Sequence, residues 1–242
     1  MNGYNATWRS TTKRIYLSVI VIAILTIATI CINYYTNWIL LNRISGFDIE
    51  TYQAMVVHFD YLWSVIMLLC LISYTIYWLL INKLRPMLSS PDSAAIKKVR
   101  TGILIFLTGL IYAVIPSTVM GSTETLARIY HYTFPLMLAA TTAGLIFMIC
   151  GFSKLRSSVF LSSKARIAFT ILKAAAIVLV IGHGLSLIFF STQFLLKSDM
   201  VKIYALLRTL NILIVYPVKI IGMILLALGW AKVKNSPAPQ NL

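Results

Sequence analysis

The sequence predicts an all-α fold: a polytopic transmembrane helical bundle of about six spans, with the N-terminus and the C-terminus both cytoplasmic. Three observations predict it. Of 242 residues, 60% are hydrophobic and only 11% are charged, whereas soluble domains carry about 25% charged residues. Uncharged stretches recur at the length of about 20 residues that a helix needs to cross the hydrocarbon core of a membrane. Finally, the basic residues gather in alternate loops.

The apolar segments account for most of the chain. Long apolar runs without alternation favour helices over barrel strands, because a helix satisfies its backbone hydrogen bonds within the segment. No remaining segment is long enough to fold as a separate soluble domain, so residues 1–242 are expected to form one membrane domain. Residues 83–100 are expected to form a loop with a brief amphipathic helix, and residues 232–242 a short flexible tail. The six expected spans are residues 15–41, 57–82, 101–120, 130–153, 168–195 and 206–231.

The net charge is +15, and most of the basic residues lie in the loops between the expected spans. Fourteen lysines and arginines flank the spans on the side of the two termini, five lie on the other side, and Lys173 and Lys219 lie within spans. The positive-inside rule accounts for this asymmetry without a nucleic-acid partner, and it predicts a multi-pass protein of the inner (plasma) membrane. The basic loops are expected to meet membrane lipids through their anionic headgroups. Other membrane subunits are the further partners we expect.

Small residues predict where helices approach closely, because lipid supplies no hydrophobic drive between helices. The fourth and fifth expected spans are rich in alanine and glycine, and we expect them to form the centre of the bundle, with close approach at Gly184. The first two spans contain no glycine and are expected to face lipid or a partner subunit.

Lys219 is the sharpest candidate for a functional residue, since charged residues at membrane depth are costly. It follows Pro217, which lacks an N–H and frees a carbonyl one turn back, so Tyr216 to Lys219 could form a broken-helix site for an anion or carboxylate. With a shifted span, Lys219 would instead reach the cytoplasmic surface as an anchor. The sequence favours the two interpretations about equally.

His183 and Asp60 complete the expected substrate or ion path. His183 lies near the middle of the fifth span, where it either bonds to a neighbouring helix or joins Lys219 in a polar midplane cavity. Asp60 lies in the first outer turn of the second span, where an interfacial carboxylate is favoured over a proton-relay acid.

His58 and His131 come from different expected helices at similar depth, as a bis-histidine haem b would require. The second span has no glycine to admit a porphyrin, and the chain lacks a C-x-x-C-H attachment motif. No other cofactor and no metal site are expected.

The favoured function is therefore non-enzymatic: a small transporter or channel-like bundle, or the membrane-embedded subunit of a larger complex. The sequence lacks H-E-x-x-H, P-loop and dinucleotide-binding motifs. A b-type cytochrome using His58 and His131 is the first alternative, and an intramembrane enzyme is the second.

Overall fold

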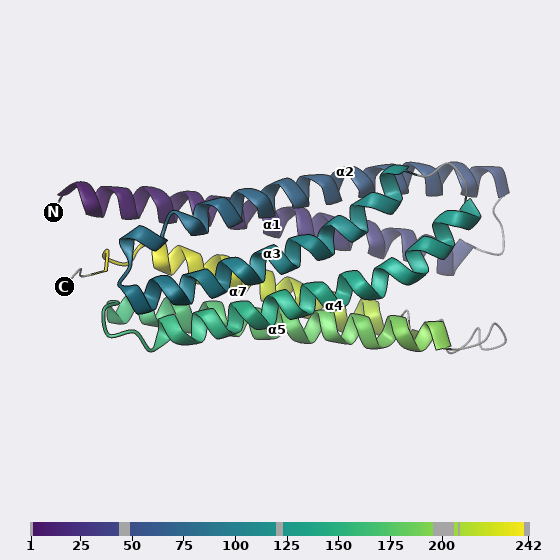
Figure 1. Cartoon of the computed structure of the whole chain (residues 1–242). Helices are drawn as coiled ribbons and strands as arrows, with labels where there is room; N and C mark the ends of the chain where they lie inside the picture. Colours follow the sequence, from purple (N-terminus) through teal and green to yellow (C-terminus); the bar gives the residue numbers. More distant parts are fainter. Residues whose placement is uncertain (1, 44–48, 120–122, 196–205, 208, 240–242) are drawn as a thin grey trace.

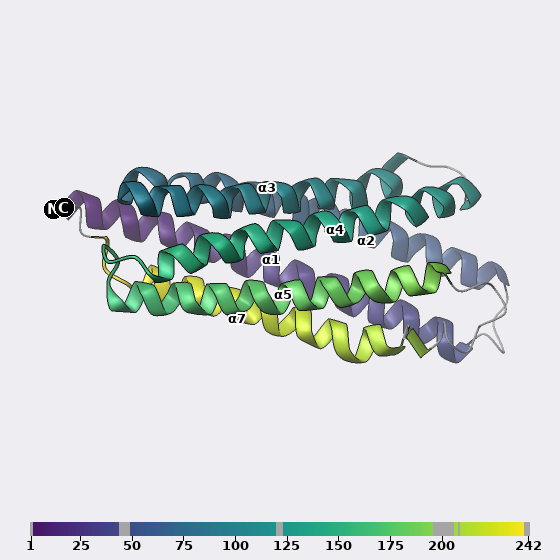
Figure 2. The ribbon, with the colours of Figure 1, turned by 60° about the horizontal axis from the view of Figure 1, so that its bottom comes forward.

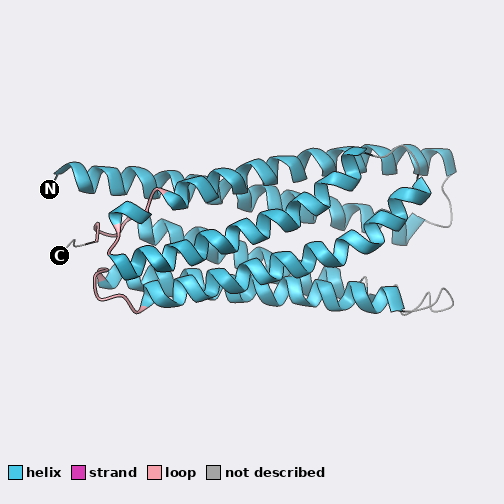
Figure 3. Cartoon of the chain, in the orientation of Figure 1, coloured by secondary structure: helices cyan, strands magenta, loops and turns pink. Residues whose placement is uncertain are grey.

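The chain folds as a bundle of long helices that run along one axis (Figure 1). The computed structural model describes the backbone of residues 2–43, 49–119, 123–195, 206–207 and 209–239, and the side chains of 4–35, 61–111, 135–189, 191, 206–207 and 209–239. Within these ranges every regular element is helical (Figure 3), which confirms the all-α prediction. The elements are α1 (Asn2–Arg43), α2 (Ile49–Asn82), the 3-10 helix η1 (Arg85–Met87), α3 (Ser90–Val119), α4 (Thr123–Arg156), α5 (Ser163–Leu195), the π-helix η2 (Asn211–Val215) and α7 (Tyr216–Lys234).

The six long helices form a closed ring. Each packs mainly against two others, in the order α1, α2, α3, α4, α5, α7 and back to α1. The two ends of the chain lie at the same end of this ring, called here the termini end (Figures 1 and 2). Because all six helices share the ring, the prediction that the fourth and fifth spans form its centre is wrong.

Five helical segments of the described residues are long and apolar enough to cross a membrane. The remaining expected span is the third, residues 101–120, of which 101–119 lie in α3, and the side chains of α3 beyond residue 111 are outside the described part of the chain. A multi-pass membrane protein is compatible with this structure, while the count of six and the cytoplasmic termini stay predictions. The five segments are Tyr4–Tyr35, Tyr61–Met87, Pro135–Arg156, Ser163–Phe189 and Asn211–Lys234.

Helices α3 and α4 touch backbone to backbone. A Cβ atom placed on Gly102 would lie 2.4 Å from the carbonyl oxygen of Gly144, and one on Gly144 would lie 2.5 Å from that of Gly102. Gly184 of α5, by contrast, has nothing within 4 Å of such an atom. The predicted close approach at Gly184 is therefore wrong, because this glycine points into open space and the tightest crossing is between α3 and α4.

Helices α5 and α7 pack along a seam that repeats every seven residues. Leu172 covers Gly229, and Leu179, seven residues later, covers Gly222. A heptad spacing keeps such contacts on one face of the helix. The next position of this seam on α5 is Ser186, which carries a hydroxyl in place of a leucine side chain.

Polar contacts connect helices near the termini end. The buried carboxylate of Asp92, in the first turn of α3, accepts hydrogen bonds from Ser89 at 2.9 Å and from Ser158 at 2.7 Å. Deeper in the bundle, the indole N–H of Trp230 donates to the hydroxyl of Tyr77 at 3.0 Å, and both side chains are fully buried. This hydrogen bond links α2 to α7.

Candidate functional site

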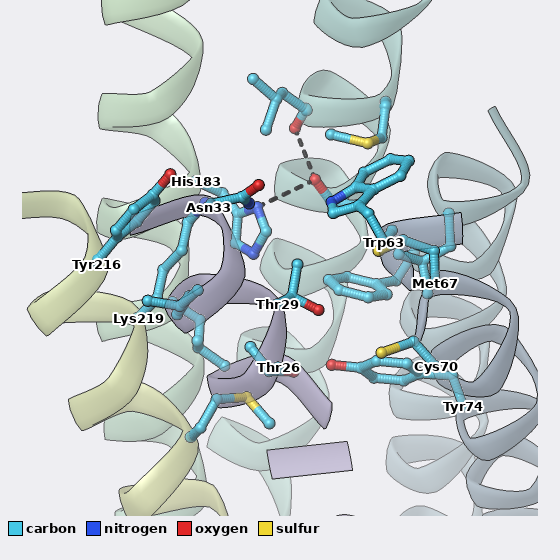
Figure 4. Close-up of a pocket in the computed structure, with 18 residues that line it drawn as sticks. Thr26, Thr29, Asn33, Trp63, Met67, Cys70, Tyr74, His183, Tyr216 and Lys219 are labelled. Atoms are coloured by element: carbon cyan, nitrogen blue, oxygen red, sulfur yellow. Dashed lines mark hydrogen bonds between the residues drawn. The ribbon is translucent and has the colours of Figure 1, made fainter. Parts of the chain in front are cut away.

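A pocket of about 170 Å³ lies inside the ring of helices (Figure 4). All six long helices contribute side chains to its wall. Along α7 the lining extends from Tyr216 to Met223, and along α2 from Trp63 to Tyr74, which corresponds to roughly 10 and 16 Å at 1.5 Å per residue. The lining residues with a polar atom are Thr26, Thr29, Asn33, Trp63, Cys70, Tyr74, Thr141, His183, Tyr216 and Lys219.

Lys219 turns into the bundle. Its Nζ donates a hydrogen bond to Ser186 Oγ of α5 at 2.9 Å. Its stem crosses α5 at Gly182, where an added Cβ would lie only 2.9 Å from Lys219 Cγ. On α5, Ser186 follows Gly182 in the direction away from the termini end, so the amine does not reach back toward that end. The geometry is that of an interior lysine, and its role in binding stays a prediction.

His183 is held by two neighbouring helices. Its Nδ1 lies 3.4 Å from Thr141 Oγ1 of α4, a contact drawn as a dashed line in Figure 4. Its ring meets Phe106 of α3 edge to face, with centroids 5.9 Å apart and planes at 85°. The structure thus brings His183 and Lys219 to one pocket, and their described hydrogen bonds go to Thr141 and Ser186. A shared role at the midplane of a membrane stays a prediction.

The charge of the pocket wall is positive. Lys219 is the lysine among the lining residues, and the wall contains no aspartate or glutamate among the described residues. The acid whose side chain is described, Asp92, is bonded to Ser89 and Ser158 at the termini end. An ammonium inside a membrane protein is costly without a counter-charge. A pocket built in this way favours an anion.

Tyr216 lines the pocket, and Pro217 follows it in the first turn of α7. Instead of the expected break, the structure has one wide turn: the Tyr216 N–H donates to the carbonyl of Asn211, five residues back. Such π turns inside helices are frequent at functional sites. The chain therefore stays helical on both sides of Pro217.

Three predicted residues have side chains outside the part of the chain that the structure describes. Asp60 and His58 belong to α2, and His131 belongs to α4. The haem b hypothesis accordingly stays a prediction, which an absorption spectrum of the purified protein would decide. Among the residues whose side chains are described, no three His, Cys, Asp or Glu side chains gather as a metal ion would require.

Sequence reasoning missed most of the pocket wall. On α1, Thr26, Thr29 and Asn33 are spaced by three and four residues within an apolar span, so they share one helix face. That pattern is a readable signal for an interior polar stripe. Ser186 carries a weaker signal, namely its place seven residues after Leu179. The aromatic wall made by Trp63, Tyr74 and Phe106 had no signal, since aromatic residues are common throughout the chain.

Comparison with known proteins finds no relative of this chain. No protein-family model matches the chain, and neither the curated proteins nor the solved structures contain a match.

Proposed function

We propose that this chain is an integral membrane transporter that binds a small molecule in its central pocket, with Lys219 as the main binding residue. The observation that carries the proposal is the closed ring: six helices of one chain surround a pocket into which a lysine turns. Substrate sites of helical transporters lie near the bilayer midplane, between helices. Side chains from all six long helices of this chain line the pocket, which supports a binding site formed between helices of one chain.

Lys219→Met tests the proposal, because methionine keeps most of the stem and removes the charge. A small molecule that binds the native state raises the melting temperature of the protein. We expect compounds from a metabolite set to stabilise the purified wild type in detergent, and we expect this stabilisation to be lost in Lys219→Met. The same compounds should enter proteoliposomes containing the wild type and not those containing the variant.

Lys173→Met is the matched control. Lys173 is the other lysine of the expected spans, it lies on α5, and it does not line the pocket. We expect its response to match that of the wild type. The proposal is wrong if Lys219→Met folds and keeps the thermal shifts and the uptake of the wild type.

A further inference from the structure

We infer that the pocket takes a small monocarboxylate with a flat apolar body, its carboxylate on the ammonium of Lys219, which Ser186 holds in place, and its body against the aromatic side chains of α2 and α3. This inference rests on the proposed function and names the substrate class of the same site. Two halves of the pocket wall carry it, one polar and one aromatic.

In the polar half, Lys219 lines the pocket and supplies the positive charge. An ammonium has three N–H donors, and the described geometry assigns one of them to Ser186. The other two suit the two oxygens of a carboxylate, and charge-assisted hydrogen bonds of this kind are short and strong. Ser186 accepts from Lys219 and lies outside the pocket lining, so its role is to position the ammonium. A single cation matches a monoanion and leaves a dianion such as phosphate half neutralised.

The aromatic half lies across the pocket on α2 and α3. The rings of Tyr74 and Phe106 have centroids 4.7 Å apart with planes inclined at 36°, and Trp63 lines the same wall. Met67 and Met137 add polarisable sulfur atoms, which make favourable contacts with rings. A flat ring or a short branched chain fits such a surface, because aromatic faces pair in offset or edge-on arrangements.

The size of the pocket limits the ligand. At about 170 Å³ it resembles the engineered apolar cavity of about 150 Å³ that binds benzene. One ring with one carboxylate is therefore near the upper limit. A chloride ion would leave the aromatic half unfilled. A zwitterionic amino acid would bring an ammonium to a wall without a carboxylate among its described residues.

The experiment compares benzoate with benzyl alcohol, which has a similar shape and no charge. We expect calorimetric titration of the purified protein to show benzoate binding at least roughly tenfold tighter than benzyl alcohol, because only benzoate forms charge-assisted bonds. Lys219→Met should remove this preference, so that benzoate binds no tighter than benzyl alcohol. Ser186→Ala should reduce it severalfold, and Lys173→Met should leave it intact. Chloride, inorganic phosphate and phenylalanine should not compete with benzoate.

The alternative outcomes separate the two proposals. Equal binding of benzoate and benzyl alcohol, insensitive to Lys219→Met, would overturn the monocarboxylate inference and leave a binding pocket in place. Competition by phosphate or phenylalanine at similar concentrations would also overturn it. If benzoate does not bind but other compounds stabilise the wild type through Lys219, the proposed substrate class is wrong and the transporter proposal stands. If no compound acts through Lys219, both are wrong.

Discussion

Gly102 and Gly144 set the distance between α3 and α4, because each faces the carbonyl oxygen of the other. A methyl group at either position would lie within 2.5 Å of a backbone atom. Backbone cannot move aside as a flexible side chain can, so the helices themselves would have to separate. In a membrane, where association depends on close packing, such a separation removes much of the attraction between two helices.

We expect Gly102→Ala to destabilise the protein and Gly184→Ala to leave it unchanged or slightly more stable. The first adds a Cβ 2.4 Å from a carbonyl oxygen, and the second adds one in open space, where alanine is the better helix former by up to about 1 kcal/mol. Thermal unfolding in the same detergent measures both. Equal melting temperatures for the two variants would contradict the backbone contact between α3 and α4.

Sequence alone could not separate these two glycines. Both stand in apolar helices, and the composition of a span says nothing about which face meets a neighbour. Lys219 was found because a charge in an apolar span is conspicuous, whereas Ser186 was missed because serine is common in such spans. The partner of the lysine depends on the register of α5 against α7, and that register is set by contacts such as Leu179 with Gly222.

Among the elements, η2 and α7 show how one wide turn places a site. The π turn over Asn211–Val215 contains one more residue than an α turn would. It therefore rotates the part of the helix before it relative to the part after it. Lys219 and the seam with α5 lie after the turn, so their placement is independent of the extra residue.

Deleting Leu213 should convert η2 into an ordinary α turn and leave benzoate binding within about threefold, because α7 keeps its register. Deleting Leu228, which is exposed like Leu213, should rotate the residues on one side of it by about 100° and destroy the seam. Titration and thermal unfolding of the two deletion variants measure the difference. If both deletions reduce benzoate binding and thermal stability equally, the π turn does not tolerate the loss of a residue.

The positions of the helices were largely predictable, and some of their ends were not. Residues 90–100 were expected to belong to a loop with a brief helix, yet they form the start of α3 (Ser90–Val119). Ser89 precedes the helix and bonds to Asp92 in its first turn, and no proline or glycine lies between Asp92 and Gly102. The helix therefore continues without a break into the apolar segment. Hydropathy detects the apolar part of a helix, and its polar extension depends on such local bonds.

For the whole molecule, the common end of the two termini gives a test of orientation. We expect reporter fusions after Asn82, Ser153 and Leu242 to report the cytoplasm, and fusions near Phe47, Thr123 and Lys197 to report the outside. The basic loops predict this orientation. An outside signal from a fusion near Lys97 would overturn it, because most of the charge asymmetry lies on that side of the chain.

The closed ring of six helices was beyond the reach of the sequence. Hydropathy gives the number and length of spans, but which helices touch depends on the faces they present. The small residues predicted a core made of two helices. In the structure each of the six helices packs against its two neighbours in the ring, and no helix occupies the interior. The polar residues Thr26, Thr29 and Asn33 on one face of α1 were the sequence feature that indicated this interior.

We expect the proposed site to be sensitive to electrical potential, because Lys219 lies within an expected membrane span. The residue lies about 22 Å along the helix from Lys234 and about 12 Å from Asn211, so an anion entering from the end away from the termini crosses roughly a third to a half of the membrane field. At about 2.3 kcal/mol per charge for a full crossing at 100 mV, its affinity would change about fivefold. With the termini in the cytoplasm, a negative interior would weaken binding from outside and strengthen binding from inside. The sign of the voltage dependence in proteoliposomes therefore reports the side from which the ligand enters.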